Sequence, residues 1–427
     1  MLTDKLKNFR ITFSTFWKRK IFKVSFSLHI TYLIIGLILT IFFLREFNDF
    51  LVYHNVGKVF ISDIENLYDP SNYLWPYRYF PLSGFLFVPF SLLPFEAAFI
   101  LFNVFNLIIN FLNCLIIHKI INLVSHNEET LKKEIYYLSL YLVALPHAFN
   151  YAMGQTNSLV SMILLASLYV FLKHDDLKWN ILGGLLVGVS LNIKPISIFI
   201  VPFLITFTIK SKGKLNISEI KRSFIRLLGA SLPILLNLPL LIAIPGLFNG
   251  FLEINFVGTG TLVVNNSFSI TRVLMNLLSM LNVETNLLLD LQIIIFLIIF
   301  VLIGVVGFLI FMIRKLQTNY IIYGYIIGIL VMLLVYFDSW DLHLIILIPL
   351  LIISIIHLED LPKDHKNRVF FQKSLKRGIY FFIFIDQPIF GLIHLLKDIF
   401  PYNFIPTIFL LLIYVSLGKY LLTGGTE

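Results

Sequence analysis

A small number of polar residues could carry chemistry in this strongly apolar chain. Asp49 belongs to the stretch EFNDFLVYHNVG (46–57), in which a helix would place Tyr53 one turn after Asp49 on the same face. A lone carboxylate at such a place can accept the proton of an attacking hydroxyl group. Tyr53 and the adjacent His54 are therefore candidate substrate-binding residues beside a candidate catalytic base.

Five further stretches combine cations, amides, tyrosines and a histidine. They are LYDPSNYLWPYRYFP (67–81), NYAMGQTNS (150–158), NIKP (192–195), GTGTLVVNNSFSITR (258–272) and FDSWDLH (337–343). Cations suit the phosphate of an anionic lipid, whereas amides and tyrosines suit sugar hydroxyls. The candidate substrate-binding residues in these stretches are Arg78, Tyr79, Gln155, Asn157, Lys194, Asn265, Arg272, Asp341 and His343.

A sugar linked to a polyprenyl phosphate already carries its leaving group. Its transfer needs a base for the acceptor and positive charge for the departing phosphate. Direct attack with one base inverts the anomeric centre, and a carboxylate pair suited to hydrolysis is not evident. The polar stretches are thus suited to a glycosyl transfer from a lipid-linked donor.

Each candidate also has an ordinary structural interpretation. Tyr73, Trp75 and Tyr77 are typical of aromatic anchors at a membrane interface. Gln155 and Asn157 would cap the following helix, and Lys194 would extend its charge to the interface from a helix end. His343 would be a hydrogen-bonded packing residue. A functional site is nevertheless favoured. All six polar stretches are expected on one side of the membrane, whereas the loops expected on the other side carry only basic charge.

Composition sets the scaffold that must position these residues. The chain is 58% hydrophobic and 13% charged, with a mean hydropathy of +0.88, which excludes a water-soluble globule. Its long apolar runs predict an all-α, polytopic transmembrane helix bundle rather than a barrel. The single cysteine, Cys114, allows neither a disulfide framework nor a cysteine metal site. A basic N-terminus without a small-residue cleavage site predicts an uncleaved anchor.

We expect twelve spans. They are 28–45, 95–124, 134–151, 157–173, 178–193, 195–209, 224–245, 286–313, 319–337, 341–357, 379–399 and 403–422. The apolar segment 81–94 is too short to cross and contains three prolines, so we expect it to be interfacial or re-entrant. The chain is then a single membrane domain over 1–427.

Charge supports this topology in the cell membrane, with both termini cytoplasmic and the candidate site extracytoplasmic. The basic segments 1–27 and 358–378 are then cytoplasmic, and 46–94 (with interfacial helices) and 246–285 are outer loops. All but six of the 33 lysines and arginines fall inside, as the positive-inside rule predicts. The exceptions are Arg45, Lys58, Arg78, Lys194, Arg272 and Lys397. The net charge of +9 follows from topology and anionic lipids, so no nucleic-acid partner is implied.

The order and spacing of several short motifs resemble glycosyltransferase family 87. They are D-F-x-x-Y (49–53), LYDP (67–70), Y-R-Y-F-P (77–81), GQTNSL (154–159), a GG-x-x-x-G pattern ending at Lys194–Pro195, NNSFSITR (265–272) and FDSWDLHLIILIPLL (337–351). The resemblance covers about residues 40–355. It implies a GT-C fold and a polyprenol-phosphate-mannose-dependent α-mannosyltransferase that needs no metal or cofactor, with membrane lipids, the lipid-linked donor and a glycan or glycolipid acceptor as partners.

The resemblance also implies individual roles. Asp49 would be the catalytic base, and His343 would hold the donor phosphate with Lys194 and Arg272. Two residues depart from the family's motifs: Phe80 interrupts the usual Y-P-P, and Asn266 stands where glutamine is common. These departures bear on which sugar and acceptor are used rather than on the type of reaction.

Two other functions are compatible with the sequence. A multispan transporter or lipid flippase would place ionisable groups near the membrane midplane, often in repeated halves. Asp386 is the residue that fits this alternative best, whereas Asp290 and Lys194 fall near expected helix ends. An assembly protein without chemistry would tolerate replacement of Asp49.

Overall fold

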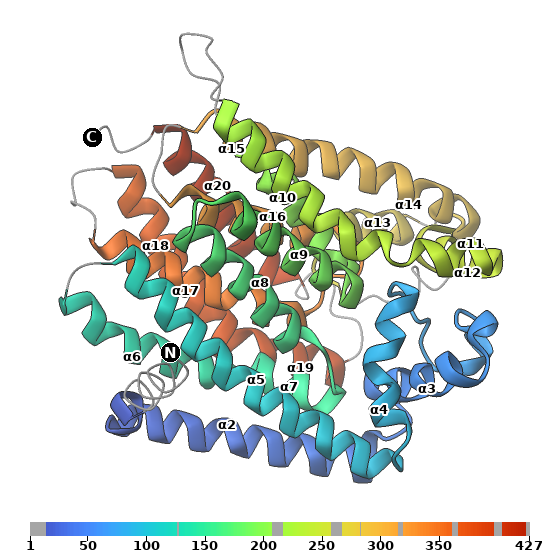
Figure 1. Cartoon of the computed structure of the whole chain (residues 1–427). Coiled ribbons are helices and arrows are strands. Elements are labelled where there is room, and N and C mark those ends of the chain that lie inside the picture. Colours follow the sequence, from blue (N-terminus) through green and yellow to red (C-terminus); the bar gives the residue numbers. More distant parts are fainter. Residues whose placement is uncertain are drawn as a thin grey trace.

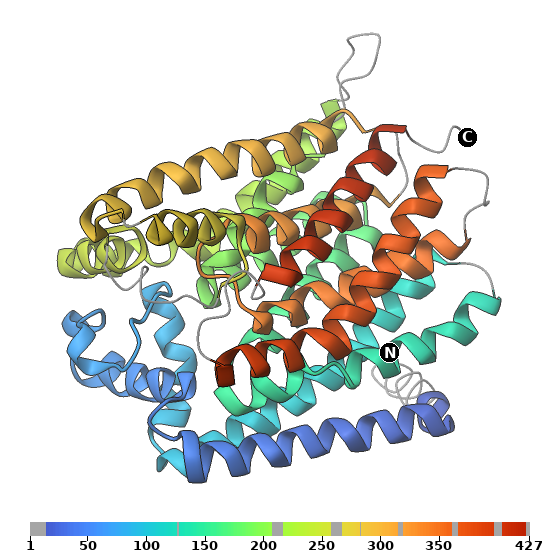
Figure 2. The same cartoon turned by 180° about the vertical axis from the view of Figure 1, so that it is seen from behind.

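The protein is a bundle of helices. The computed structural model describes residues 14–125, 128–206, 217–257, 267–281, 283–314, 319–360, 366–396 and 404–423. Within these ranges all regular secondary structure is helical. The first turn of α2 and the last turn of α20 lie at one end of the bundle, and α3 lies at the opposite end (Figures 1 and 2).

Among the described residues, five helices are long and apolar enough to cross a membrane. Three of them contain a short π- or 3-10 segment, labelled η. They are α2 (Lys20–Leu39) with η1 (Thr40–Leu44), α5 (Phe95–Val124), α14 (Thr285–Ile299) with η8 (Phe300–Val305) and α15 (Val306–Met312), η9 (Asp341–His343) with α17 (Leu344–Asp360), and α20 (Ile405–Thr423). The α17 helix is enclosed by other helices, so it forms the centre of the bundle.

Shorter apolar helices complete the bundle. Three of them coincide with expected spans but have only 16 or 17 residues: α8 (Asn157–Lys173), α9 (Leu177–Ile193) and α16 (Tyr320–Val335). A span of hydrocarbon needs about 20 helical residues, so the expected number of twelve full spans is not reproduced by length alone.

Proline divides two of the expected spans and changes the helix type of a third. The expected helix 134–151 is two helices, α6 (Glu128–Leu142) and α7 (Pro146–Met153). The expected 195–209 is a 3-10 helix, η5 (Pro195–Leu204), and 224–245 is α10 (Ile217–Leu235) followed by α11 (Leu238–Ala243). Proline lacks the backbone N–H and clashes with the preceding turn, which explains the breaks near Pro146, Pro195 and Pro239.

The structure also differs from the prediction at 358–378, which was expected to be an inner loop. From Lys366 it is helical, since α18 (Lys366–Tyr380) continues through η10 (Phe381–Ile385) into α19 (Asp386–Leu396). The segment 81–94 contains η4 (Pro81–Phe87) and α4 (Val88–Ser91), which together are too short to cross a bilayer.

The α9 and α10 helices pack unusually closely. Gly184 and Gly188 on α9 face Arg226 and Ala230 on α10, where a Cβ atom on either glycine would overlap a backbone oxygen. Small residues allow such close contact between helices in a membrane bundle. This contact fixes the end of α9, from which Lys194 follows.

The segments 46–94 and 238–257, which include residues expected in the two outer loops and are called the outer segments below, form one compact lobe. The first contains α3 (Asp49–Ser62), η2 (Ile64–Asn66), η3 (Pro70–Asn72), η4 and α4, and the second contains α11, α12 (Pro245–Leu252) and η6 (Glu253–Val257). The next helix, α13 (Ile270–Met280), packs against α14 and α16. A buried cluster that includes Phe50, Tyr77, Phe87 and Leu247 joins the two outer segments. Figure 1 shows α3 and α4 beside α11 and α12 at one end of the bundle.

The turn after α7 depends on Gly154. Its φ of 61° is left-handed, and a Cβ atom there would lie 2.6 Å from Phe50 Cβ and 2.9 Å from a ring carbon of Phe99. Only glycine adopts this backbone without strain and leaves room for the start of α3. The turn thereby brings the residue after it, Gln155, against the outer lobe.

We predict that Gly154→Ala lowers the melting temperature of the detergent-purified protein. The left-handed backbone alone costs about 1–2 kcal/mol for a residue with a Cβ atom, and the overlap with Phe50 adds to it. Gly391→Ala is the matched control, because nothing lies within 4 Å of its added methyl group. Equal melting temperatures for the two variants would contradict this role of Gly154.

Candidate active site

Asp49 is the first residue of α3. Asn48 caps this helix, since its side-chain oxygen accepts a hydrogen bond of 2.8 Å from the Phe50 N–H. The same side chain donates to the carbonyl of Ala152 in α7. Asn48 therefore fixes the start of α3 to the end of α7, and the helix N-terminus stabilises a negative charge on Asp49.

The side chain of Gln155 joins the candidate base to the candidate phosphate ligand. Its amide nitrogen donates to Asp49 Oδ2 at 2.5 Å. Its amide oxygen accepts from Lys194 Nζ at 3.1 Å and from the Tyr53 hydroxyl at 3.0 Å. Tyr53 is in turn 2.9 Å from the hydroxyl of Tyr79. One amide thus bridges a carboxylate and an ammonium group.

Asparagines hold this bridge from behind. The backbone carbonyl oxygen of Gln155 accepts hydrogen bonds from the side-chain nitrogens of Asn106 (3.2 Å) and Asn150 (3.3 Å). Lys194 Nζ also donates to Asn157 at 2.5 Å, and Asn157 donates to Asn150 at 3.3 Å. Lys194 is 4% exposed and its neighbours are fixed, so its ammonium group has a defined position.

The loop between α16 and α17 brings further polar groups. Asp338 forms an ion pair of 2.8 Å with Arg78 from the first outer segment and accepts from the indole of Trp340. The backbone N–H of Trp340 donates to His343 Nδ1 at 3.1 Å. Nδ1 is therefore an acceptor, so a neutral His343 carries its proton on Nε2.

These groups surround one cavity of about 730 Å³. Its polar lining includes Asp49, Arg78, Tyr79, Gln155, Lys194, Asp338 and His343. Aromatic side chains also line it, among them Trp75, Phe149, Phe251, Tyr336 and Trp340. Aromatic faces beside convergent polar groups are well suited to a sugar ring, and the volume fits a substrate larger than one sugar.

Three predicted site residues are adjacent to the cavity but do not line it. Tyr53 and Asn157 contact the cavity residues Gln155 and Lys194 by hydrogen bonds. Arg272 is 2% exposed in α13. Burial lowers its pKa to about 10; the charge of Asp338 raises this pKa and that of Arg78 lowers it. All three support the site without lining it.

Two other predicted residues are not at the cavity. The ring of His54 turns away, with Nε2 2.9 Å from the Leu93 carbonyl and its edge against Phe95, because it follows Tyr53 on the next helical position. Asp341 is buried with its carboxyl group against that of Asp386. Asn265 lies outside the described residues.

Asp338 and Trp340 also line the cavity, although neither was predicted from the sequence as a site residue. Both belong to the stretch FDSWDLH, from which Asp341 and His343 were selected. The two acids are three residues apart, and nothing in the sequence shows that the loop turns Asp338 rather than Asp341 toward Arg78. The many aromatic residues of the outer segments were the available signal for Trp340.

The surroundings shift the acidity of the two central groups. Burial raises the pKa of Asp49, the Gln155 hydrogen bond and the charge of Lys194 lower it, and Asp338 raises it again, with a net increase. Burial lowers the pKa of Lys194 to about 8, although Asp49 and Asp338 oppose the shift. Both groups are thereby moved toward neutral pH, which is typical of catalytic sites.

Among the described residues, no group of three or more His, Cys, Asp and Glu side chains is arranged to hold a metal ion.

The fold and the site together define a helical membrane protein with a polar, aromatic-lined cavity at one end of its bundle. Residues 77–336 match the sequence profile of glycosyltransferase family 87. The match extends over more than half of the chain, which therefore belongs to this family and is a glycosyltransferase. A comparison with curated proteins found no match. The matched range includes Arg78, Gln155 and Lys194, whereas Asp49 and His343 lie outside it.

We predict a bell-shaped dependence of kcat/KM on pH. Activity should rise as Asp49 loses its proton, at a pH above the ordinary range of an aspartate, because only the carboxylate accepts a proton. It should fall as the pH passes about 8, where Lys194 loses its charge. Lys194→Arg should move the alkaline limb upward, since a guanidinium stays protonated. An alkaline limb at the same pH in both proteins would contradict the assignment to Lys194.

Proposed function

We propose that the protein moves a hexose, with mannose as the first candidate, from a polyprenyl-phosphate donor to an acceptor hydroxyl. The transfer takes place on the extracytoplasmic side, inverts the anomeric centre and uses Asp49 as general base. The acceptor is a glycan or a glycolipid. No metal or other cofactor takes part in the proposed transfer, as the resemblance to the family implies.

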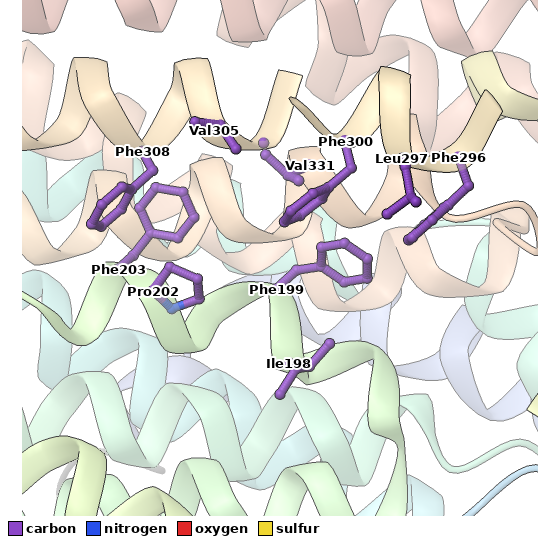
Figure 3. Close-up of a pocket in the computed structure, with 11 residues that line it drawn as sticks. Ile198, Phe199, Pro202, Phe203, Phe296, Leu297, Phe300, Val305, Phe308 and Val331 are labelled. Carbon is purple, nitrogen blue, oxygen red and sulfur yellow. The ribbon is translucent and has the colours of Figure 1, made fainter. Parts of the chain in front are cut away.

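The observation that carries this proposal is the continuity of the polar cavity with an apolar groove. The groove has a volume of about 380 Å³ and lies between η5 and the continuous helix α14–η8–α15. Figure 3 shows Phe199, Pro202 and Phe203 on one side and Phe300, Val305 and Phe308 on the other. A lipid-linked sugar needs such a pair of compartments, one for the sugar phosphate and one for the chain.

The two compartments share part of their lining. Ile198, Phe199, Phe296 and Leu297 border both the groove and the cavity. A prenyl chain in the groove would therefore place its phosphate near the start of η5, where Lys194 precedes Pro195. Lys194 and the Nε2–H of His343 would then face the phosphate from the cavity wall.

The cavity residues can perform each part of the transfer. The acceptor oxygen forms a bond to the anomeric carbon while the bond from that carbon to the phosphate oxygen breaks, and its electron pair stays on the phosphate. The acceptor proton passes to the carboxylate of Asp49, which Gln155 orients. The charge that develops on the phosphate is stabilised by Lys194, His343 and Arg78.

We predict that Asp49→Asn folds and inserts normally but loses transfer by about 10²–10⁴-fold, because an amide cannot accept the proton. The assay uses purified protein in liposomes with polyprenyl phosphate mannose labelled in the sugar, and candidate glycan or glycolipid acceptors. Glu65→Gln is the matched control, since Glu65 is an exposed acid of the same outer segment. Full turnover of Asp49→Asn would exclude this residue as the base.

We predict that Gly304→Leu narrows the apolar groove. A Cβ atom at Gly304 would lie 2.9 Å from the ring of Phe300 and 3.3 Å from Val331, so a larger side chain must enter the groove. Transfer from a long-chain donor should fall about tenfold or more, since each CH₂ kept from an apolar site costs about 0.8 kcal/mol. Transfer from a donor with one or two isoprene units should change much less.

The control for this variant is Leu302→Phe, at an exposed position two residues away on the same helix. Equal loss with short-chain and long-chain donors would show that the groove does not hold the prenyl chain.

A further inference from the structure

The ion pair between Arg78 and Asp338 is not explained by the transfer reaction. The two residues are 260 positions apart in the sequence, and their side chains, 16% and 23% exposed, both line the cavity. The carboxylate of Asp338 also accepts the indole N–H of Trp340, so two donors hold it at the cavity wall. A carboxylate engaged in this way is poorly placed to serve as a second base.

The charges that line the cavity are balanced. The cations are Arg78 and Lys194, and the carboxylates are Asp49 and Asp338. Lys194 is held by the neutral amide oxygens of Gln155 and Asn157, whereas Arg78 is paired with a full negative charge. An incoming phosphate would therefore meet Lys194 as an available cation but compete with Asp338 for Arg78.

The donor and the product of the proposed transfer differ in charge. A sugar linked through phosphate to a prenyl chain is a phosphodiester with one negative charge. The prenyl phosphate that remains after transfer is a monoester, with about −1.5 to −2 charges at pH 7. A cavity that must bind the first and release the second needs a device that disfavours the extra charge.

We propose that Asp338 is this specificity-determining residue: its fixed negative charge beside Arg78 lets the cavity accept the phosphodiester donor and disfavours the phosphomonoester product. This inference rests on the proposed function.

The charge changes during turnover fit this role. When the acceptor proton reaches Asp49, the cavity loses one negative charge as the phosphate gains one, so the product is still tolerated at that moment. When Asp49 releases the proton, two carboxylates again face the phosphate monoester in a partly buried cavity, where repulsion is stronger than in water. The product is then expelled.

An alternative role for Asp338 predicts the opposite sign. If Asp338 only orients Arg78 for phosphate, its removal weakens the binding of both lipids, and of the more highly charged monoester most of all. The effect of Asp338→Asn on the two affinities therefore separates the two roles. The amide keeps the shape of the side chain and can still accept the indole hydrogen bond of Trp340.

The experiment measures the Kd of full-length protein in nanodiscs for polyprenyl phosphate and for its methyl phosphodiester. We expect Asp338→Asn to tighten monoester binding about tenfold and diester binding clearly less, while product inhibition of transfer increases. Asp338→Glu should keep the ratio found for the unmodified protein. If Asp338→Asn is poorly folded, Asp338→Ser gives the same comparison with a smaller side chain.

The control is Glu96→Gln, which breaks an exposed ion pair between Arg45 and Glu96 (2.8 Å). Neither residue lines the cavity, so both affinities should stay unchanged. An unchanged ratio in Asp338→Asn, or weaker monoester binding, would overturn the inference. Because lipid binding is measured without turnover, this failure is distinct from that of the proposed function, in which the unmodified protein would not transfer the sugar.

Discussion

The candidate site depends on one interaction, in which the side-chain amide of Gln155 lies between the carboxylate of Asp49 and the ammonium group of Lys194. A carboxylate and an ammonium removed from bulk water are costly unless each has hydrogen-bonding partners. Gln155 satisfies both, because an amide offers a donor to one and an acceptor to the other. It also keeps the two groups from neutralising each other by direct contact, which leaves the carboxylate able to take a proton and the cation able to hold a phosphate.

Much of the surrounding structure serves to hold this amide. Gly154 allows the chain to turn where α7 meets α3, and Asn48 binds the same end of α7. On α5, Asn103, Asn106, Asn110 and Asn113 form a buried polar stripe, from which Asn106 reaches the carbonyl of Gln155. Hydrogen bonds between helices are the available means of fixing such a position in an apolar bundle. The close contact of α9 with α10 then sets the place of Lys194.

The helical membrane character and many of the polar cavity residues could be predicted from sequence, because isolated polar groups in an apolar chain are conspicuous. Helix periodicity places Tyr53 on the same face of α3 as Asp49, as predicted. The same periodicity places His54 on another face of α3, away from the cavity. The exact spans could not be predicted, since prolines such as Pro146 and Pro195 convert apolar runs into short or 3-10 helices. The choice between Asp338 and Asp341 depends on a contact with Arg78 that only tertiary structure provides.

Membership of glycosyltransferase family 87 favours a transferase over a transporter, although a buried acid pair, Asp341 and Asp386, lies within the bundle. The most direct test of the account is an experimental structure of the protein with polyprenyl phosphate bound, determined in a lipid nanodisc. The account predicts that the phosphate lies between Lys194 and His343 in the cavity that contains Asp49, with its prenyl chain along Phe199 and Phe300. A phosphate bound elsewhere on the bundle, with this cavity empty, would contradict it.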